Sequence, residues 1–209
     1  MSRAFEQLFG VGNAFGSIPM PGRTDWWLLE RALDTHGIAH DDPRVAQFHD
    51  VYLGRLARAL DEPAPAAARK GVLPGVRELL DELADGRAAS LALLTGNYER
   101  AARLKLEHFD LWRRFHAGAF GDSVSDRNLL LAEALHRAGR AIGRAFTAAE
   151  TIVIGDTPHD VAVAKAGGAR SIAVATGSHS VDELRATGAD YVFQDLSRVS
   201  EVVAAIDAV

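Results

Sequence analysis

Hydrophobic residues in the first part of the chain recur every three or four positions. The clearest examples are DWWLLERALDTHG (residues 25–37) and DPRVAQFHDVYLGRLARAL (42–60). This spacing is typical of helices that bury one face. We therefore expect residues 2–62 to be helical throughout.

Beyond this region, short and continuously apolar runs alternate with helical patterns. The predicted strands are 89–96, 115–120, 151–156, 170–177 and 189–193, and the predicted helices are 73–86, 98–109, 126–139, 159–168, 180–188 and 197–206. Buried strands separated by helices indicate a parallel sheet that is covered on both faces. The predicted fold class is α/β, a doubly wound parallel sheet with an all-helical domain before it.

The stretch DEPAPAAARKG (61–71) interrupts the helical pattern with proline and alanine. Such breaks mark connections between structural units. We place a domain boundary near Ala66, which divides the chain into a helical domain (1–66) and an α/β domain (67–209).

The amino-acid composition indicates which kinds of molecule the protein binds. Hydrophobic residues make up 48% of the 209 residues and charged residues 24%, as in folded globular proteins. The net charge of −5 and the scattered arginines argue against a nucleic-acid binder, which usually has a basic face. Without cysteine or a long apolar run, the sequence predicts a cytoplasmic protein, monomeric or homodimeric, that binds neither nucleic acid nor membrane.

The residues that follow the predicted strands point to one kind of site. Ligands of parallel sheets bind at the carboxyl ends of strands. There the sequence places small, hydroxyl and acidic residues: Thr95, Gly96, Asn97, Gly121, Asp122, Gly155, Asp156, Thr176, Gly177 and Ser178. Backbone amides beside small residues can bind phosphate, and acids can hold a divalent cation. We therefore predict a metal-assisted phosphate site.

Two acids stand where a strand gives way to a helix. Asp156 ends the predicted strand, and Asp160 falls in the first turn of the next helix, after Pro158. Carboxylates so close repel each other, and Mg²⁺ would remove the repulsion. In the alternative reading, Asp156 caps the helix and Asp160 interacts with the helix dipole.

These motifs resemble the haloacid dehalogenase-like superfamily, in its phosphoglycolate-phosphatase-like branch with a helical cap. LALLTGN (91–97) is similar to the second motif of the family, and VIGDTPHDV (153–161) to the fourth. The resemblance implies that Thr95, Gly96 and Asn97 bind the phosphoryl group. It also implies that Asp156 ligates Mg²⁺ and that Asp160 supports the ligand shell. Taken alone, Thr95 is equally typical of a turn.

Two arginines complete the implied site. None of Lys70, Lys105 and Lys165 stands where the third motif normally has a lysine, so we assign that role to Arg127 in SDRNLL (125–130). Arg23, in the cap segment MPGRTD (20–25), is a candidate for binding an anionic leaving group. The alternative for both is an arginine exposed to solvent.

The first motif of the family, a strand that ends in Asp-x-Asp-x-Thr with the nucleophile, has no counterpart in this sequence. In the family fold that strand is central, so without it strands 89–96 and 151–156 would lie about 10 Å apart rather than the usual 4.8 Å or so. Three outcomes are open: the two strands pair directly, another segment fills the gap, or the sequence belongs to a longer protein, for instance through a misplaced start codon. We favour the third.

The resemblance implies hydrolysis of a small phosphorylated metabolite through an aspartyl-phosphate, but the nucleophile for that route is not among these residues. A second hypothesis is therefore a non-catalytic phosphate-binding or interaction protein on the same fold. A third, dehalogenation or phosphonate cleavage, is weaker, because dehalogenation needs no metal and the acidic pair Asp156 and Asp160 would then have no role.

Overall fold

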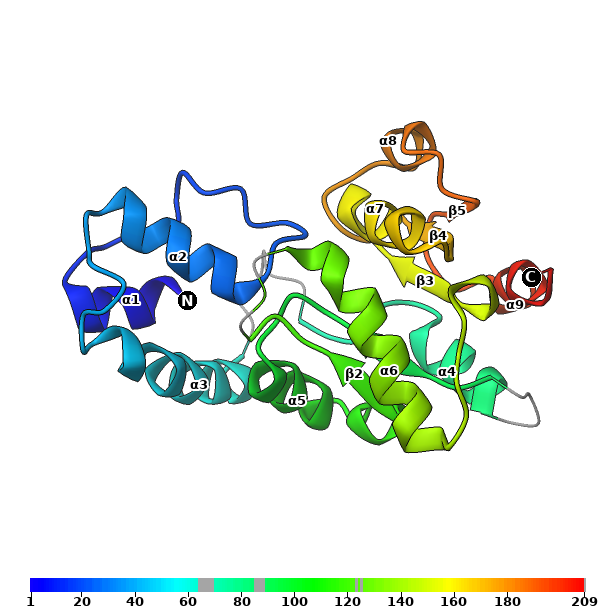
Figure 1. The fold of residues 1–209 in the computed structure, drawn as a ribbon, viewed down its shortest axis with the longest axis horizontal. Helices are drawn as coiled ribbons and strands as arrows, with labels where there is room; N and C mark the ends of the chain where they lie inside the picture. Colours follow the sequence, from blue (N-terminus) through cyan, green and yellow to red (C-terminus); the bar gives the residue numbers. More distant parts are fainter. Residues whose placement is uncertain (64–69, 85–88, 123, 125, 209) are drawn as a thin grey trace.

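The computed structural model describes residues 1–63, 70–84, 89–122, 124 and 126–208. Three helices lie at one end of the molecule and the strands with their helices at the other (Figure 1). The predicted boundary at Ala66 lies outside the described residues. Within them, no helix is long and apolar enough to cross a membrane.

The helical end consists of α1 (Ser2–Phe9), α2 (Asp25–Thr35) and α3 (Val45–Asp61). Their apolar faces meet in one core, in which Phe5 and Phe48 are fully buried. The prediction that residues 2–62 are helical throughout is wrong for residues 36–44, which connect α2 to α3 through turns, and also between α1 and α2. There Gly10 ends α1 in the left-handed region (φ 74°), and a run rich in glycine and proline continues as turns.

The other end contains every predicted strand and helix, with shorter strands. The strands are β1 (Ala92–Leu94), β2 (Ala117–Ala119), β3 (Ile152–Gly155), β4 (Arg170–Val174) and β5 (Tyr191–Phe193). The helices are α4 (Val76–Ala84), α5 (Glu99–His108), α6 (Leu130–Ile142), α7 (Pro158–Gly167), α8 (Val181–Ala186) and α9 (Val199–Asp207).

All paired strands are parallel, as predicted, but they form two sheets. One contains β1 and β2, and the other contains β3, β4 and β5 in that order. In the described part of the chain β1 and β3 do not pair, so the first of the three outcomes above, direct pairing, is wrong. Strand β3 is therefore an edge strand of its sheet, and its Ile154 is 37% exposed.

Helix α6 connects the two sheets. It packs against β1 and β2 and also touches α7, and Figure 1 shows it crossing in front of β2. Its Leu131 shares one apolar cluster with Val153 of β3, against which Leu94 of β1 also packs. The two sheets are therefore held by side-chain packing rather than by strand pairing.

Candidate active site

The turn between β3 and α7 is built by hydrogen bonds to Asp160. Thr157 caps α7, Pro158 occupies the first turn, and the Thr157 N–H and hydroxyl donate to Asp160 Oδ2 at 2.9 and 2.7 Å. This reciprocal arrangement is a capping box. The alternative reading is thus confirmed for Asp160 as a first-turn acid and is wrong for Asp156, because Thr157 is the cap.

Arg127 lies against the other oxygen of the same carboxylate. Its Nη2 is 2.5 Å from Asp160 Oδ1, and the two side chains are only 15% and 8% exposed. A short 3-10 turn (Arg127–Leu129), capped by Asp126, positions it ahead of α6. Arg127 is therefore largely buried rather than exposed to solvent. Its Nε is also buried and has no hydrogen-bond partner among the residues that the structure describes, which leaves a donor for an anion.

Asp156 is held next to this pair. A side chain at Gly177 would place its Cβ 2.5 Å from Asp156 Oδ2, so the loop after β4 closes directly over the carboxylate. Burial, and secondarily the charge of Asp160, raises the pKa of Asp156, while Arg127 and His179 oppose the shift. The predicted repulsion between the two acids is thus present, partly offset by Arg127.

The loop after β1 is fixed by its own backbone. The Thr95 N–H donates to the Ala119 carbonyl at 3.1 Å, and the Asn97 N–H donates to Thr95 Oγ1 at 3.2 Å. The Gly121 N–H donates to the Asn97 carbonyl at 2.9 Å. The Thr95 hydroxyl accepts one bond within a turn, and its hydrogen is available to donate to a ligand.

The segment from Gly22 to Trp26 reaches both halves of the site. A Cβ at Gly22 would lie 2.4 Å from His159 of α7, and one at Gly96 would lie 2.3 Å from the Arg23 carbonyl oxygen. The Asp25 N–H donates to the Gly96 carbonyl at 2.7 Å. This segment therefore connects the loop after β1 to the start of α7, and it brings Arg23 to the carboxyl ends of the strands.

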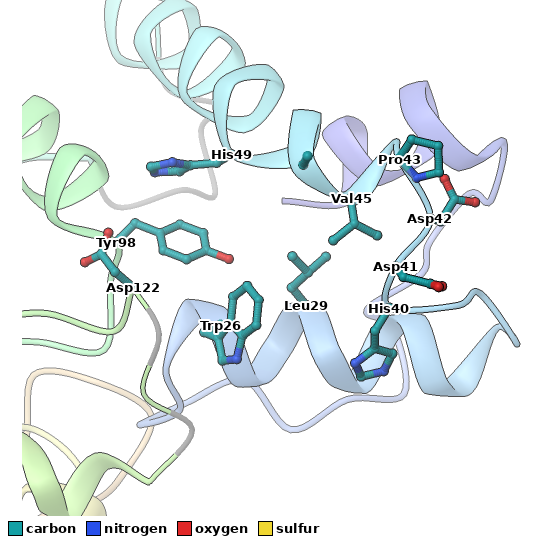
Figure 2. Close-up of a pocket in the computed structure, with 11 residues that line it drawn as sticks. Trp26, Leu29, His40, Asp41, Asp42, Pro43, Val45, His49, Tyr98 and Asp122 are labelled. Atoms are coloured by element: carbon teal, nitrogen blue, oxygen red, sulfur yellow. The ribbon is translucent and has the colours of Figure 1, made fainter.

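The two tryptophans at the start of α2 face different sides, as consecutive helical residues must. The guanidinium of Arg23 lies 4.6 Å from the centre of the Trp27 ring. Trp26 instead lines a pocket of about 420 Å³ between α2, α3 and the loops after β1 and β2, together with Leu29, Tyr98 and Asp122 (Figure 2). Arg23 is not among the residues that line this pocket.

Two site residues were not found from the sequence. Asp25, which is 6% exposed, accepts a hydrogen bond from the Tyr98 N–H at 2.9 Å, and Lys105 Nζ donates to Asn97 Oδ1. Asp25 looks in the sequence like an ordinary first-turn acid after a threonine cap. In the sequence, Lys105 does not stand at the third-motif position, and nothing in its spacing shows that its amine reaches back to Asn97.

A metal ion would find few protein ligands here. No group of three or more acidic, histidine or cysteine side chains that could hold a metal is present among the described residues. Asp160 is already bonded to Arg127 and Thr157. Asp156 remains as a ligand for a cation, and this fits Mg²⁺, which often takes one or two carboxylates together with water and phosphate.

Comparison with known proteins agrees with this geometry. A family described as "HAD-hyrolase-like" matches residues 128–199. The "Probable phosphatase IndB" of Dickeya dadantii is 33% identical over 165 residues, which cover 76% of this chain and 66% of that protein. A phosphoglycolate phosphatase of Rhodospirillum rubrum is 30% identical over 183 residues, or 87% of this chain and 73% of that protein. The chain thus spans about two thirds to three quarters of the length of these relatives.

Solved structures show the same fold at lower identity. The crystal structure of CbbY from Rhodobacter sphaeroides in complex with phosphate superposes with a TM-score of 0.67 at 18% identity. The superposition covers 94% of this chain and 87% of CbbY. Together with the identity to the curated phosphatases, this shows that the chain belongs to the haloacid dehalogenase-like superfamily, in its phosphoglycolate-phosphatase-like branch.

Proposed function

We propose that this protein forms the phosphate-binding and metal-binding half of a Mg²⁺-dependent phosphatase for a small phosphorylated metabolite. The observation that carries the proposal is the largely buried Arg127, in the turn beside Asp156. Its Nη2 is paired with Asp160, and its Nε has no partner among the described residues. A buried arginine with a free donor suits an anion, and a carboxylate beside it suits a cation. The relatives with the name phosphatase support the same reaction class.

Each residue has a role in this proposal. Arg127, the Thr95 hydroxyl and the amides of Gly96 and Asn97 hold the phosphoryl oxygens. Asp156 would hold Mg²⁺, and Asp160 would support the site by fixing Arg127. The ion, when bound, offsets the negative charge of the phosphoryl group. Helices α1 to α3 act as a cap, from which Arg23 binds an anionic leaving group.

The nucleophile has to come from elsewhere, because the sequence contains no Asp-x-Asp pair. We propose that a further strand, which pairs with β1 on one side and β3 on the other, supplies it. Those two strands do not pair with each other in the described part of the chain, and Ile154 of β3 is exposed. The new strand would cover these groups and end at the site, where its Asp attacks phosphorus and a second Asp protonates the leaving oxygen.

The test is hydrolysis of a generic aryl phosphate, with and without Mg²⁺, by the 209-residue chain and by a form extended upstream in frame. We expect Mg²⁺-dependent activity only in the extended form. Activity in the short form would contradict the assignment of the nucleophile. An upstream segment without an Asp-x-Asp pair would contradict the proposal of a missing strand.

A second candidate function is phosphate binding without catalysis, favoured by the absence of the Asp-x-Asp pair. It predicts that the 209-residue chain binds inorganic phosphate with Mg²⁺, and that no extended form hydrolyses aryl phosphate. Isothermal titration calorimetry with phosphate, beside the activity assay, separates the two functions.

Replacing Asp156 with Asn should remove the effect of Mg²⁺ and stabilise the metal-free protein. Because the pKa of Asp156 is raised on folding, its ionised form opposes folding; this penalty is present above the raised pKa and absent below the ordinary one. At 100 times its dissociation constant, Mg²⁺ should stabilise the wild type by about 2.7 kcal/mol and D156N not at all. Thermal denaturation at neutral pH, with and without Mg²⁺, measures both effects.

The exposed Asp182 provides the control for this substitution, because D182N removes the same charge from a side chain that is 92% exposed and paired with Arg185. D182N should respond to Mg²⁺ as the wild type does. An undiminished Mg²⁺ response of D156N would remove Asp156 from the proposed metal site.

A further inference from the structure

Lys105 is a partly buried amine next to the phosphate loop. It projects from α5, and its Nζ donates a hydrogen bond to Oδ1 of Asn97 in the loop after β1. The buried Asp25 of α2 is the acidic group whose charge acts on it. Burial lowers the pKa of the Lys105 amine, and the charge of Asp25 opposes that shift. An ammonium group in such a place is costly, and the negative charge of Asp25 offsets part of that cost.

The contact determines which way the Asn97 carboxamide points. An ammonium group can donate hydrogen bonds but cannot accept one, so the oxygen of the carboxamide must face Lys105. The NH₂ end must then face away from it. Within the described part of the chain, the Asn97 NH₂ has no hydrogen-bond partner, whereas the backbone N–H and carbonyl of Asn97 are both bonded.

The free NH₂ belongs to the loop that would bind phosphate. The Asn97 N–H is bonded to Thr95 Oγ1, so the two residues adjoin at the carboxyl end of β1. Asp25 fixes the same loop from the helical side, because its N–H donates to the Gly96 carbonyl and its carboxylate accepts from the Tyr98 N–H. Hydrogen bonds at Gly96 and Tyr98 thus hold the loop on both sides of Asn97. The Asn97 carboxamide therefore cannot change direction through a movement of the loop.

We propose that Lys105 is a positioning residue: it orients the Asn97 carboxamide so that the NH₂ group donates to an oxygen of the bound phosphoryl group. This inference rests on the proposed function for the presence of a bound phosphoryl group. The orientation of the Asn97 carboxamide does not depend on the proposed function. Lys105 does not touch the phosphate. It replaces a freely rotating amide with a donor that points in one direction before the ligand arrives, which lowers the entropic cost of binding.

The test compares Lys105→Met, which has a similar shape and no charge, with wild type and with Lys105→Arg. Because Lys105→Met removes a positive charge that acts on the buried Asp25, the double variant Lys105→Met/Asp25→Asn is also made, so that a folding defect in the single variant does not end the test. Lys165→Met is the control, because Lys165 is exposed and bonds only the Thr187 carbonyl in the described structure.

The first measurement is binding of inorganic phosphate in the presence of Mg²⁺, by calorimetry on the 209-residue chain. We expect about tenfold weaker binding for Lys105→Met and for the double variant, since one oriented hydrogen bond to a charged ligand is lost. Lys105→Arg should recover most of the affinity, and Lys165→Met should match wild type. Equal affinity of the double variant and wild type would overturn the proposal.

The second measurement needs no ligand and separates this inference from the proposed function. Nitrogen-15 relaxation should show the Lys105 ammonium protons in slow exchange and an Asn97 carboxamide with little motion about its Cβ–Cγ bond in wild type, and a more mobile Asn97 carboxamide in Lys105→Met. An ordered Asn97 carboxamide without phosphate binding would contradict the proposed function and leave the Lys105 contact in place. A mobile Asn97 carboxamide in the wild type would overturn the inference itself.

Discussion

Replacing Asp160 with Ala is expected to lower the free energy of unfolding by about 3–5 kcal/mol. The substitution leaves the Arg127 guanidinium buried without a partner, since the 2.5 Å pair joins side chains that are 15% and 8% exposed. It also removes the two bonds that Thr157 donates to the carboxylate at the start of α7. Urea denaturation at neutral pH measures the loss.

Two companion variants show whether burial is the cause. Asp182→Ala breaks an ion pair of 3.1 Å with Arg185, but the Asp182 side chain is 92% exposed, so the loss should be below about 1 kcal/mol. The double variant Asp160→Ala/Arg127→Leu has no unpaired charge at this place. Its loss in the free energy of unfolding should therefore be smaller than the sum of the losses in the two single variants. A loss for D160A as small as that for D182A would show that the Arg127–Asp160 pair is not effectively buried.

The same contacts explain how Asp160 can be a first-turn acid of α7 and also support the proposed phosphate site. One carboxylate oxygen closes the capping box with Thr157, and the other holds Arg127. A residue that fixes a helix start can therefore also orient the cation at the proposed phosphate site. The sequence pattern GDTPHD predicted the position of Asp160, but it could not show that both oxygens are already bonded.

The order of elements was readable from the sequence because it depends on local patterns. Continuous apolar runs and helical periodicity identified every strand and α-helix from β1 to α9, but not the short 3-10 turns at Trp112–Arg114 and Ala148–Glu150. Residues 36–44, a second connection, and residues 10–24 were misassigned as helix. In residues 10–24, apolar residues such as Phe15 and Ile18 fall at helical spacing and are buried, although the backbone there is turned by Gly10 and Asn13. Burial of a side chain does not require a helix around it.

Contacts between residues far apart in the chain could not be predicted from the sequence. Arg127 was assigned to the phosphate site by the resemblance alone, and its pair with Asp160 joins residues 33 positions apart. The bond from the Tyr98 N–H to Asp25 spans 73 positions. The separation of β1 from β3 was anticipated, because it follows from the position of a missing strand in the family fold, whereas the packing of Leu131 across the gap was not.

The close approach of the helical end to the phosphate loop leads to the second large effect. Gly96→Ala should destabilise the protein by about 1–3 kcal/mol, the usual cost of an overpacked site. The new Cβ would lie 2.3 Å from the Arg23 carbonyl oxygen and 3.0 Å from Thr24 Cα, both backbone atoms. Neither side can easily yield, because the Asp25 N–H is bonded to the Gly96 carbonyl at 2.7 Å.

We expect the segment from Gly22 to Trp26 to detach in G96A, and hydrogen exchange to become faster at Asp25 and Tyr98, whose contacts depend on it. Gly54→Ala is the matched control. Gly54 lies inside α3, and apart from its chain neighbours and the nearby backbone of that helix, no atom of the described residues lies within 4 Å of the position of an alanine Cβ, so alanine should raise helix stability by up to about 1 kcal/mol. Denaturation of the two variants should therefore shift in opposite directions. If G96A were as stable as wild type, the helical end would have to rest against the phosphate loop less closely than the structure shows, and the anchoring of Asn97 between Asp25 and Lys105 would lose one of its two supports.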